Sequence, residues 1–493
     1  MAGPGRQQKR RPRLTAWLGA ALLGAALGTA NAQEARSIDD LFGGPAPVAK
    51  PAAPAAKPAT PAPTSIDDLF GGPAPKPATS ATPATATDAP ALADPGAALP
   101  AKPAVTGFYQ NDLAYTYARP RHWSRFNNML DLAVSGKGDG FAYKLGGRVN
   151  YDPIYDLTDH YPAAVRDDQR FEAMVREAYV DFGAGDFEFR LGRQHVVWGE
   201  VVGLFVADVV SAKDLRQAAL PDFDIIRTPQ WAARAEYFAG NFHAEAVWIP
   251  AMTYNDIGKP GAEFYPFAVP AGASVAKERK PGGIDDAGYG LRLSYLQSGW
   301  DVTGFYYSAN DLNAAFRRVS PTLYQPIHER VHQTGLTVSK DLGPAIFKGE
   351  AVHTRDRLFS TFDPTDADGL VKQDTLDWLL SLEWSFPQET RFNAQFFQRY
   401  HFDHDPGIGA DRAESGVSFL FSTQALHPRL EPRLLLLHSL NRSDYSAQFK
   451  LVWRASGNWR LAAGVDVFGG SPNGLFGYYD SRDRVYTEAR YSF

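Results

Sequence analysis

The 493-residue chain has no cysteine, and beyond its first 32 residues it has no apolar run that approaches 18 residues. Without disulfides, a secreted protein of this size must be stabilised by packing or by a closed network of hydrogen bonds. Without a long apolar run, the mature chain cannot cross a membrane as helices. The formal net charge of −5, from 50 basic and 55 acidic residues, argues against nucleic acid as a partner.

Residues 1–32 have the composition of a secretory signal. Basic residues gather at 6–13, an apolar stretch follows at 14–27, and Ala-Asn-Ala at 30–32 is a small-residue cleavage site. The apolar stretch is too short for a comfortable transmembrane helix. We therefore expect cleavage before Gln33 and export from the cytoplasm.

Residues 33–105 are dominated by Ala, Pro and Thr. Such a segment cannot bury enough apolar surface to offset the conformational entropy lost on folding, so we expect an extended, mobile arm. One eleven-residue sequence occurs twice within it, at 37–47 and at 65–75, and reads Ser-Ile-Asp-Asp-Leu-Phe-Gly-Gly-Pro-Ala-Pro.

This repeat has the pattern of a short docking helix. In each copy Ser and the second Asp have the spacing of a capping box, and Ile, Leu and Phe share one face at i, i+3 and i+4. Two copies would raise the avidity for a partner groove. We expect partner contacts from Ile38, Asp39, Asp40, Leu41, Phe42, Ile66, Asp67, Asp68, Leu69 and Phe70. The alternative is a recent duplication within a neutral linker.

From residue 106 onward the chain consists of segments of roughly ten residues in which apolar and polar side chains alternate. In the last segment, one face carries Val485, Thr487, Ala489, Tyr491 and Phe493, and the other carries Tyr486, Glu488, Arg490 and Ser492. Such strands are typical of membrane barrels, which are apolar toward lipid and polar toward the lumen. A soluble sandwich also alternates, but Trp and Tyr at segment ends match membrane-interface girdles.

The connections between segments alternate in length. Tight ones, such as 183–186 and 298–299, alternate with long ones at 153–169, 199–228, 251–285, 357–372 and 402–411. Short periplasmic turns and long outer loops are typical of outer-membrane barrels.

The sequence therefore predicts an all-β fold, a transmembrane antiparallel β-barrel of about 18 strands over residues 106–493, with the arm in the periplasm. Sixteen strands is the alternative, because segments around 108–135 and 310–341 are poorly delimited. We expect outer-membrane lipid around the barrel. Tyr491 and Phe493 are predicted to form the assembly signal for the barrel-assembly machinery.

The most distinctive stretch is Leu-Gly-Arg-Gln-His-Val-Val-Trp-Gly-Glu at 191–200, followed by Asp-Val-Val-Ser-Ala-Lys-Asp-Leu-Arg at 208–216 and Ala-Leu-Pro at 219–221. It resembles a proteobacterial outer-membrane family of unknown function, marked by Arg-Gln-x-x-x-Trp-Gly-Glu, then Asp-Val and Asp-Leu-Arg, then Leu-Pro. The resemblance covers the barrel and not the arm. A looser resemblance, limited to 191–194, is to alginate-export barrels.

Members of the first family are often encoded beside exporters of the resistance-nodulation-division type and a periplasmic lipoprotein-carrier-like protein. The resemblance therefore implies transport of a hydrophobic or lipid-like substrate, and the looser one a polysaccharide.

Read from its residues alone, this stretch predicts a loop folded into the barrel. Its apolar residues at 201–206 are unsuited to a loop bathed in water. Ser211 and Asp214 have capping-box spacing, so we expect a short helix over 212–220, ended by Pro221. By strand parity and sequence, the predicted lumen and constriction residues are Glu188, Arg190, Gln194, Trp198, Glu200, Phe205, Asp208, Asp214 and Arg216. Their charges either anchor the loop or contact substrate.

No catalytic residue, metal site or cofactor is predicted. The run His-Phe-Asp-His-Asp at 401–405 has ligand-type residues but lies where a strand enters an outer loop. We therefore interpret these residues as polar side chains that face solvent, and not as a metal site. The acidic residues at 363–368 lack the terminal Glu of a calcium loop. There is no Gly-x-Ser-x-Gly elbow. Inward positions mix charges of both signs, which argues against strong ion selectivity.

These patterns predict an outer-membrane conduit for export or exchange of a hydrophobic or lipid-like substrate, or a polysaccharide. A periplasmic or inner-membrane transport protein, docked by the repeats, is the expected partner. The alternative is a self-sufficient diffusion porin for a small solute, and a minor alternative is an outer-membrane enzyme.

Overall fold

The computed structural model describes residues 103–493 except 202, 268, 271 and 362. The predicted signal peptide and nearly the whole predicted arm, with both repeats, lie outside these residues.

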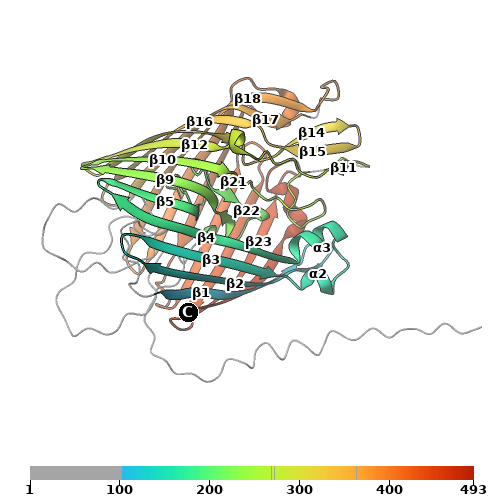
Figure 1. Cartoon of the computed structure of the whole chain (residues 1–493). Helices are drawn as coiled ribbons and strands as arrows, with labels where there is room; N and C mark the ends of the chain where they lie inside the picture. Colours follow the sequence, from blue (N-terminus) through green and yellow to red (C-terminus); the bar gives the residue numbers. More distant parts are fainter. Residues whose placement is uncertain (1–102, 202, 268, 271, 362) are drawn as a thin grey trace, which may run out of the picture.

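Eighteen antiparallel strands form one closed sheet (Figure 1), which confirms the predicted barrel and excludes the alternative of sixteen strands. The strands, in order around the barrel, are β1 Ala104–Thr116, β2 His122–Lys137, β3 Ala142–Tyr151, β4 Phe171–Ala184, β5 Phe187–Gln194, β9 Gln230–Ala239, β10 Phe242–Ala251, β12 Gly288–Gln297, β13 Trp300–Asn310, β16 Arg330–Asp341, β17 Ile346–Ser360, β18 Leu370–Phe386, β19 Thr390–His401, β20 Ala413–Ser422, β21 Leu430–Ser439, β22 Tyr445–Arg454, β23 Trp459–Gly469 and β24 Arg484–Ser492. Among the described residues, no helix is long and apolar enough to cross a bilayer.

The outer face of the barrel is apolar and the inner face is polar. In β18, Leu380 and Leu382 are exposed on the outside, whereas the alternate residues Ser381 and Glu383 are buried on the inside. In most of the strands the same alternation exposes Leu, Phe, Tyr, Trp or Val and buries Arg, Glu, Gln, Ser or Thr. A sheet in water would do the reverse, so the outer face is suited to lipid.

The barrel closes where the last strand meets the first. β24 pairs with β1 from Arg484 opposite Thr116 to Ser492 opposite Phe108. Beyond the last pair, the amide of Phe493 donates to the carbonyl of Gly107 and the amide of Gly107 donates to the carbonyl of Phe493, each over 3.0 Å. The C-terminal residue is therefore part of the closing pair.

The two ends of the barrel differ. Short turns, such as 185–186 and 298–299, lie at the end where the described chain begins and ends. At the other end, the largest connections are 152–170, 195–229, 252–287 and 311–329. This alternation agrees with the predicted one, except that the connection predicted at 357–372 is only 361–369 and that the sequence did not indicate the long connection 311–329.

Connections 152–170, 252–287 and 311–329 form a loop cap at the long-connection end (Figure 1). They contain α2 Ile154–Leu157, α3 Ala163–Gln169, β11 Ser274–Val275, β14 Ala315–Ser320 and β15 Leu323–Ile327. Their apolar side chains pack together in a cluster of Ile154, Tyr155, Tyr161, Val165, Ala262, Tyr265 and Phe316. The β14–β15 hairpin accounts for the poorly delimited segments near residue 310, because it adds two short strands that belong to a separate sheet and not to the wall.

Deleting Phe493 should reduce assembly into the outer membrane more than it reduces secretion. The deletion removes two backbone hydrogen bonds to Gly107 and the terminal aromatic ring. Heat-modifiable migration of the membrane fraction on gels measures the assembled barrel. Phe493→Trp keeps the backbone pairing and an aromatic ring, so it should assemble near the wild-type level. Undiminished assembly after the deletion would contradict the role assigned to the C-terminal residue.

Candidate functional site

The connection between β5 and β9, residues 195–229, folds into the barrel as the sequence predicted. We call it the inward loop. Trp198, 1% exposed, lies against the inward-facing rings of Phe305 and Tyr307, with ring centroids 5.2 and 5.8 Å away. Its Nε1 donates to Glu245 Oε1 over 3.1 Å. A Cβ at Gly290 would lie 2.6 Å from the Trp198 ring, so glycine there makes room for it.

Trp198 belongs to an apolar cluster that joins the inward loop to the wall. The cluster comprises Val196, Trp198, Ala207, Val209 and Val210 of the loop and Ala232, Val247, Ile249, Phe305, Tyr307, Ala309 and Val352 of the wall. An inward-facing apolar patch on β10, β13 and β17 is unusual in a polar lumen. Burial of this patch against the loop holds the loop inside the barrel.

A buried carboxylate clamps the tip of the inward loop. Glu350 of β17, 3% exposed, accepts hydrogen bonds from the amides of Glu200, Val201 and Ala207 over 2.6, 2.9 and 2.8 Å. Lys348 Nζ donates to the carbonyl of Glu200 over 3.1 Å. Hydrogen bonds to a charged acceptor are stronger than neutral ones, so this cluster fixes the turn at 200–207.

Glu200 also binds the wall through its side chain. Its Oε1 accepts a hydrogen bond from Thr337 Oγ1 over 3.2 Å and lies 3.5 Å from Arg292 Nη2. The predicted lumen residue Glu200 therefore anchors the loop to β12 and β16.

Asp208 forms a second anchor within the loop. Its Oδ2 accepts a hydrogen bond from Arg227 Nε over 3.0 Å and lies 3.8 Å from Lys213 Nζ. Burial alone would raise the pKa of Asp208, but the charges of Lys213 and Arg227 outweigh it and hold this pKa below its ordinary value. Lys213 and Arg227 also lie over the Phe205 ring, 4.7 and 5.8 Å from its centroid.

The predicted helix over 212–220 is wrong. Ala212–Lys213 forms strand β6, which pairs with β8 at Arg227–Thr228, and Arg216–Ala219 forms β7. Ser211 Oγ donates to the carbonyl of Val196 over 2.7 Å and caps nothing. The amides of residues 213, 214 and 215 bond to Asn255 Oδ1, the Ile226 carbonyl and the Asp256 carbonyl. Pairing of β6 with β8 holds the segment extended, and Asp256 takes the amide of residue 215, which in a helix would bond to the carbonyl of Ser211.

Asp214 and Arg216 pair with each other. Arg216 Nε donates to Asp214 Oδ1 over 2.8 Å, and its Nη2 donates to Asp214 Oδ2 and to Glu172 Oε2, both over 2.6 Å. The pair ties the loop to β4.

The predicted residues on β5 belong to the wall. Arg190 makes a bidentate pair with Asp181 of β4, over 2.6 and 2.9 Å. Gln194, fully buried, donates to the carbonyls of Arg190 and Ala232 over 3.1 and 3.0 Å. Glu188 lies at the short-turn end of β5 and faces inward with Arg190. These three stiffen the barrel beside the inward loop.

A cavity of about 650 Å³ lies beside the inward loop. Leu204, Phe205 and Val206 form one side of it, and other apolar side chains in its lining are Phe359, Phe397, Leu475 and Phe476. Its charged lining includes Asp208, Lys213, Arg357, Asp377, Arg399, Glu414 and Arg442. The structure therefore brings the predicted residues Phe205 and Asp208 to a cavity of mixed apolar and charged character.

The cationic groups of the cavity are paired. Arg357 bonds to Asp311 and Asp377 over 2.9 and 3.3 Å, and Arg442 binds Glu414 with a bidentate contact of 2.6 and 2.8 Å. Their charges are largely neutralised, so the cavity favours neither sign strongly.

The run at 401–405 does not gather into a metal site. His401 Nδ1 lies 3.0 Å from Gln373 Oε1, and His404 Nε2 lies 2.7 Å from the carbonyl of Ala410.

Sequence reasoning missed Glu350 and the aromatic residues Phe359 and Phe397. Parity places Glu350 and Phe397 at inward positions of their strands, whereas Phe359 faces inward only because a bulge between Thr354 and Arg357 shifts the alternation of β17. Which inward residues meet the loop depends on the path of the loop across the lumen. The sequence therefore carries no signal that singles them out.

A closed 18-stranded barrel with an apolar outer face and a loop folded into its lumen is a porin-like fold of the outer-membrane type. The chain belongs to the family described as Protein of unknown function (DUF1302), whose model matches residues 110–493. Among curated proteins, none matches this chain.

Three solved structures illustrate the likeness. OccK8 (OprE) of Pseudomonas aeruginosa is 10% identical, with a TM-score of 0.48 over 79% of this chain and 97% of that chain. OccAB1 of Acinetobacter baumannii is 9% identical, with a TM-score of 0.49 over 79% and 96%. An anion-selective porin from Comamonas acidovorans is 12% identical, with a TM-score of 0.38 over 80% and 99%. Likenesses at this level carry no information about substrate or partner.

Glu350→Gln should loosen the inward loop and make single-channel currents in planar bilayers larger and noisier. The change removes the charge that three loop amides bind, and a hydrogen bond to a charged group contributes about 1.5–3 kcal/mol. Glu389→Gln, in the short turn after β18, is the matched control and should leave the currents unchanged. Identical currents from Glu350→Gln and wild type would show that this carboxylate does not hold a constriction.

Proposed function

We propose that the protein is an outer-membrane channel that exports or exchanges a hydrophobic or lipid-like molecule past the inward loop. The observation that carries this proposal is the apolar lining of the lumen cavity. Leu204, Phe205 and Val206 line a space of about 650 Å³ together with Phe359 and Phe397. Apolar side chains at a constriction do not help water or small polar solutes to pass through a diffusion pore. They do stabilise an apolar substrate by removing its surface from water.

The charged part of the lining suits an amphipathic molecule. Arg357 and Arg442 lie in the same cavity as Phe359 and Phe397, although each is paired with a carboxylate. An acidic headgroup can exchange places with such a carboxylate while its tail lies on the aromatic rings. A neutral polysaccharide would instead use the rings as stacking surfaces, and it is the weaker candidate.

The repeats of the arm supply the second part of the proposal. Leu41, Phe42, Leu69 and Phe70 are large apolar residues in a segment of Ala, Pro and Thr. They suit a docking function toward a periplasmic or inner-membrane transport protein. In this arrangement the arm lies in the periplasm, at the short-turn end of the barrel, and the chain acts as a conduit and not as an enzyme.

Replacing Phe359 and Phe397 with Ser should weaken binding of a fluorescent long-chain fatty acid to the purified barrel by at least about tenfold. Loss of a buried aromatic side chain costs at least about 1.5–3 kcal/mol of apolar contact. Leu435→Ser, at another inward position of the wall, is the matched control and should bind as wild type does. Absence of fatty-acid binding by wild type, together with rapid entry of small sugars in liposome swelling, would favour the diffusion porin.

Replacing Leu41, Phe42, Leu69 and Phe70 with Ala should leave the barrel inserted but abolish transport in cells. Changes in one copy should be milder, because the remaining copy still binds. Thr82→Ala with Thr85→Ala, between the repeats and the barrel, is the matched control. Pull-down with a peptide of residues 37–75 measures the docking directly. Normal transport by the fourfold variant would make the arm a tether.

A further inference from the structure

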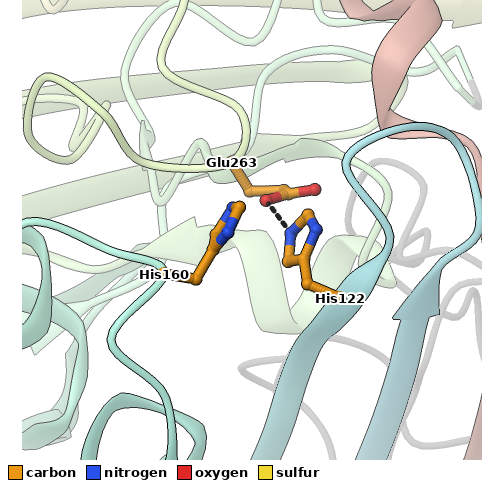
Figure 2. Close-up of side chains that lie close together, drawn as sticks. All are labelled: His122, His160 and Glu263. Carbon is orange, nitrogen blue, oxygen red and sulfur yellow. Dashed lines mark hydrogen bonds and ion pairs between the residues drawn. The ribbon is translucent and has the colours of Figure 1, made fainter.

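His122, His160 and Glu263 come together at the long-connection end of the barrel, outside the lumen cavity. His122 begins β2, His160 lies between α2 and α3, and Glu263 belongs to the connection 252–287 (Figure 2). One nitrogen of each imidazole and one carboxylate oxygen of Glu263 all lie within 4.8 Å of one another. Three segments far apart in the sequence thus present three metal-ligand atoms to one small space.

The hydrogen bonds of His122 orient its Nε2 toward this space. Its Nδ1 lies 2.7 Å from the carbonyl oxygen of Pro120, which can only accept, so Nδ1 carries a hydrogen. Its Nε2 lies 2.9 Å from Glu263 Oε2, another acceptor. That nitrogen must therefore hold either a proton or a metal cation. An Nδ1–H bonded to a backbone carbonyl, with Nε2 directed at a cation, is the usual arrangement of metal-binding histidines.

Glu263 is held in place by donors on its other sides. Thr116 Oγ1 donates to Oε1 and Tyr161 OH donates to Oε2, each over 2.9 Å. Arg482 Nε donates to its backbone carbonyl over 2.9 Å. The side chains of His122 and Glu263 are only 7% and 3% exposed. The carboxylate is therefore fixed in orientation and shielded from solvent. Carboxylates that bind metals are usually held by supporting hydrogen bonds of this kind.

His160 completes the set from the solvent side. Its ring stacks on that of His122, with centroids 3.8 Å apart and planes 18° from parallel. Ligands of a tetrahedral Zn²⁺ with bonds of about 2.0–2.1 Å lie about 3.3 Å apart, and their lone pairs converge on the ion. The two rings must therefore rotate out of the stack to share one ion, and His160, which is exposed on a loop, is free to make that rotation.

We propose that His122, His160 and Glu263 bind a divalent transition-metal cation of the Zn²⁺ type. Two imidazoles and one carboxylate suit Zn²⁺ better than Ca²⁺ or Mg²⁺, which prefer sets of oxygen ligands. Three protein ligands leave a fourth position for water. The cation links β2 to connections 152–170 and 252–287, and so fastens the loop cap at the mouth of the barrel.

Titration of the untagged, metal-free barrel with Zn²⁺ in a calorimeter tests the site. Wild type should bind one ion per chain, and Co²⁺ in its place should give the visible absorption bands of a tetrahedral site. His160→Ala should weaken binding by at least about tenfold, because it removes one ligand of three. His160 is exposed, so this variant should fold like wild type, which heat-modifiable migration on gels checks.

His427→Ala, at an exposed histidine in a short turn, is the matched control and should bind Zn²⁺ as wild type does. Glu263→Gln keeps acceptors for Thr116 and Tyr161 while removing the charge, so it should also weaken binding. Absence of one-to-one binding by wild type would show that His122 and Glu263 form an ion pair only. Equal affinities of wild type and His160→Ala would likewise overturn the site.

Discussion

Every backbone amide and carbonyl in the hydrocarbon region of a membrane needs a partner within the protein, and the architecture of this chain depends on that constraint. An open sheet would leave two unpaired edges. Pairing of β1 with β24, extended by the two hydrogen bonds between Gly107 and Phe493, removes both edges. Closure of the sheet gives the backbone groups of the wall their hydrogen-bond partners. The side chains are then constrained only to be apolar on the outer face and polar on the inner face, which the alternation of each strand provides.

A self-sufficient wall leaves the lumen free for a specialised loop. The inward loop is not one of the paired strands of the closed sheet, so its sequence is constrained mainly by what it contacts inside. Two different interactions hold it there. Burial of Trp198 and its neighbours against a patch on the wall provides affinity, and Glu350 fixes the backbone of the tip. Leu204, Phe205 and Val206, which line one part of the cavity, belong to the tip of the loop that Glu350 holds in place.

The two ends of the barrel carry different functions in the proposed arrangement. At the short-turn end, the chain enters β1 from the arm, which is where a periplasmic partner would dock. At the other end, the long connections pack into a cap around an apolar cluster, and His160 and Glu263 of two of these connections lie close to His122 of β2. The lumen cavity lies between these ends. In this arrangement, a substrate that leaves the periplasm meets the inward loop first and the loop cap second, and a substrate that enters meets them in the reverse order.

Strand alternation, turn lengths and the C-terminal aromatic residues sufficed to predict the barrel, its strand number and the inward loop, because side-chain period and closure follow from local chemistry. The predicted helix over 212–220 failed because residues 212–213 pair with 227–228 and the amide of residue 215 bonds to Asp256, and no local pattern reveals these partners. Strand parity places Glu350 on the inner face of the barrel. Only the path of the loop determined that its carboxylate accepts hydrogen bonds from the loop amides. The convergence of His122, His160 and Glu263 likewise required the tertiary structure, because their nearest ligand atoms come from segments separated by many residues along the chain.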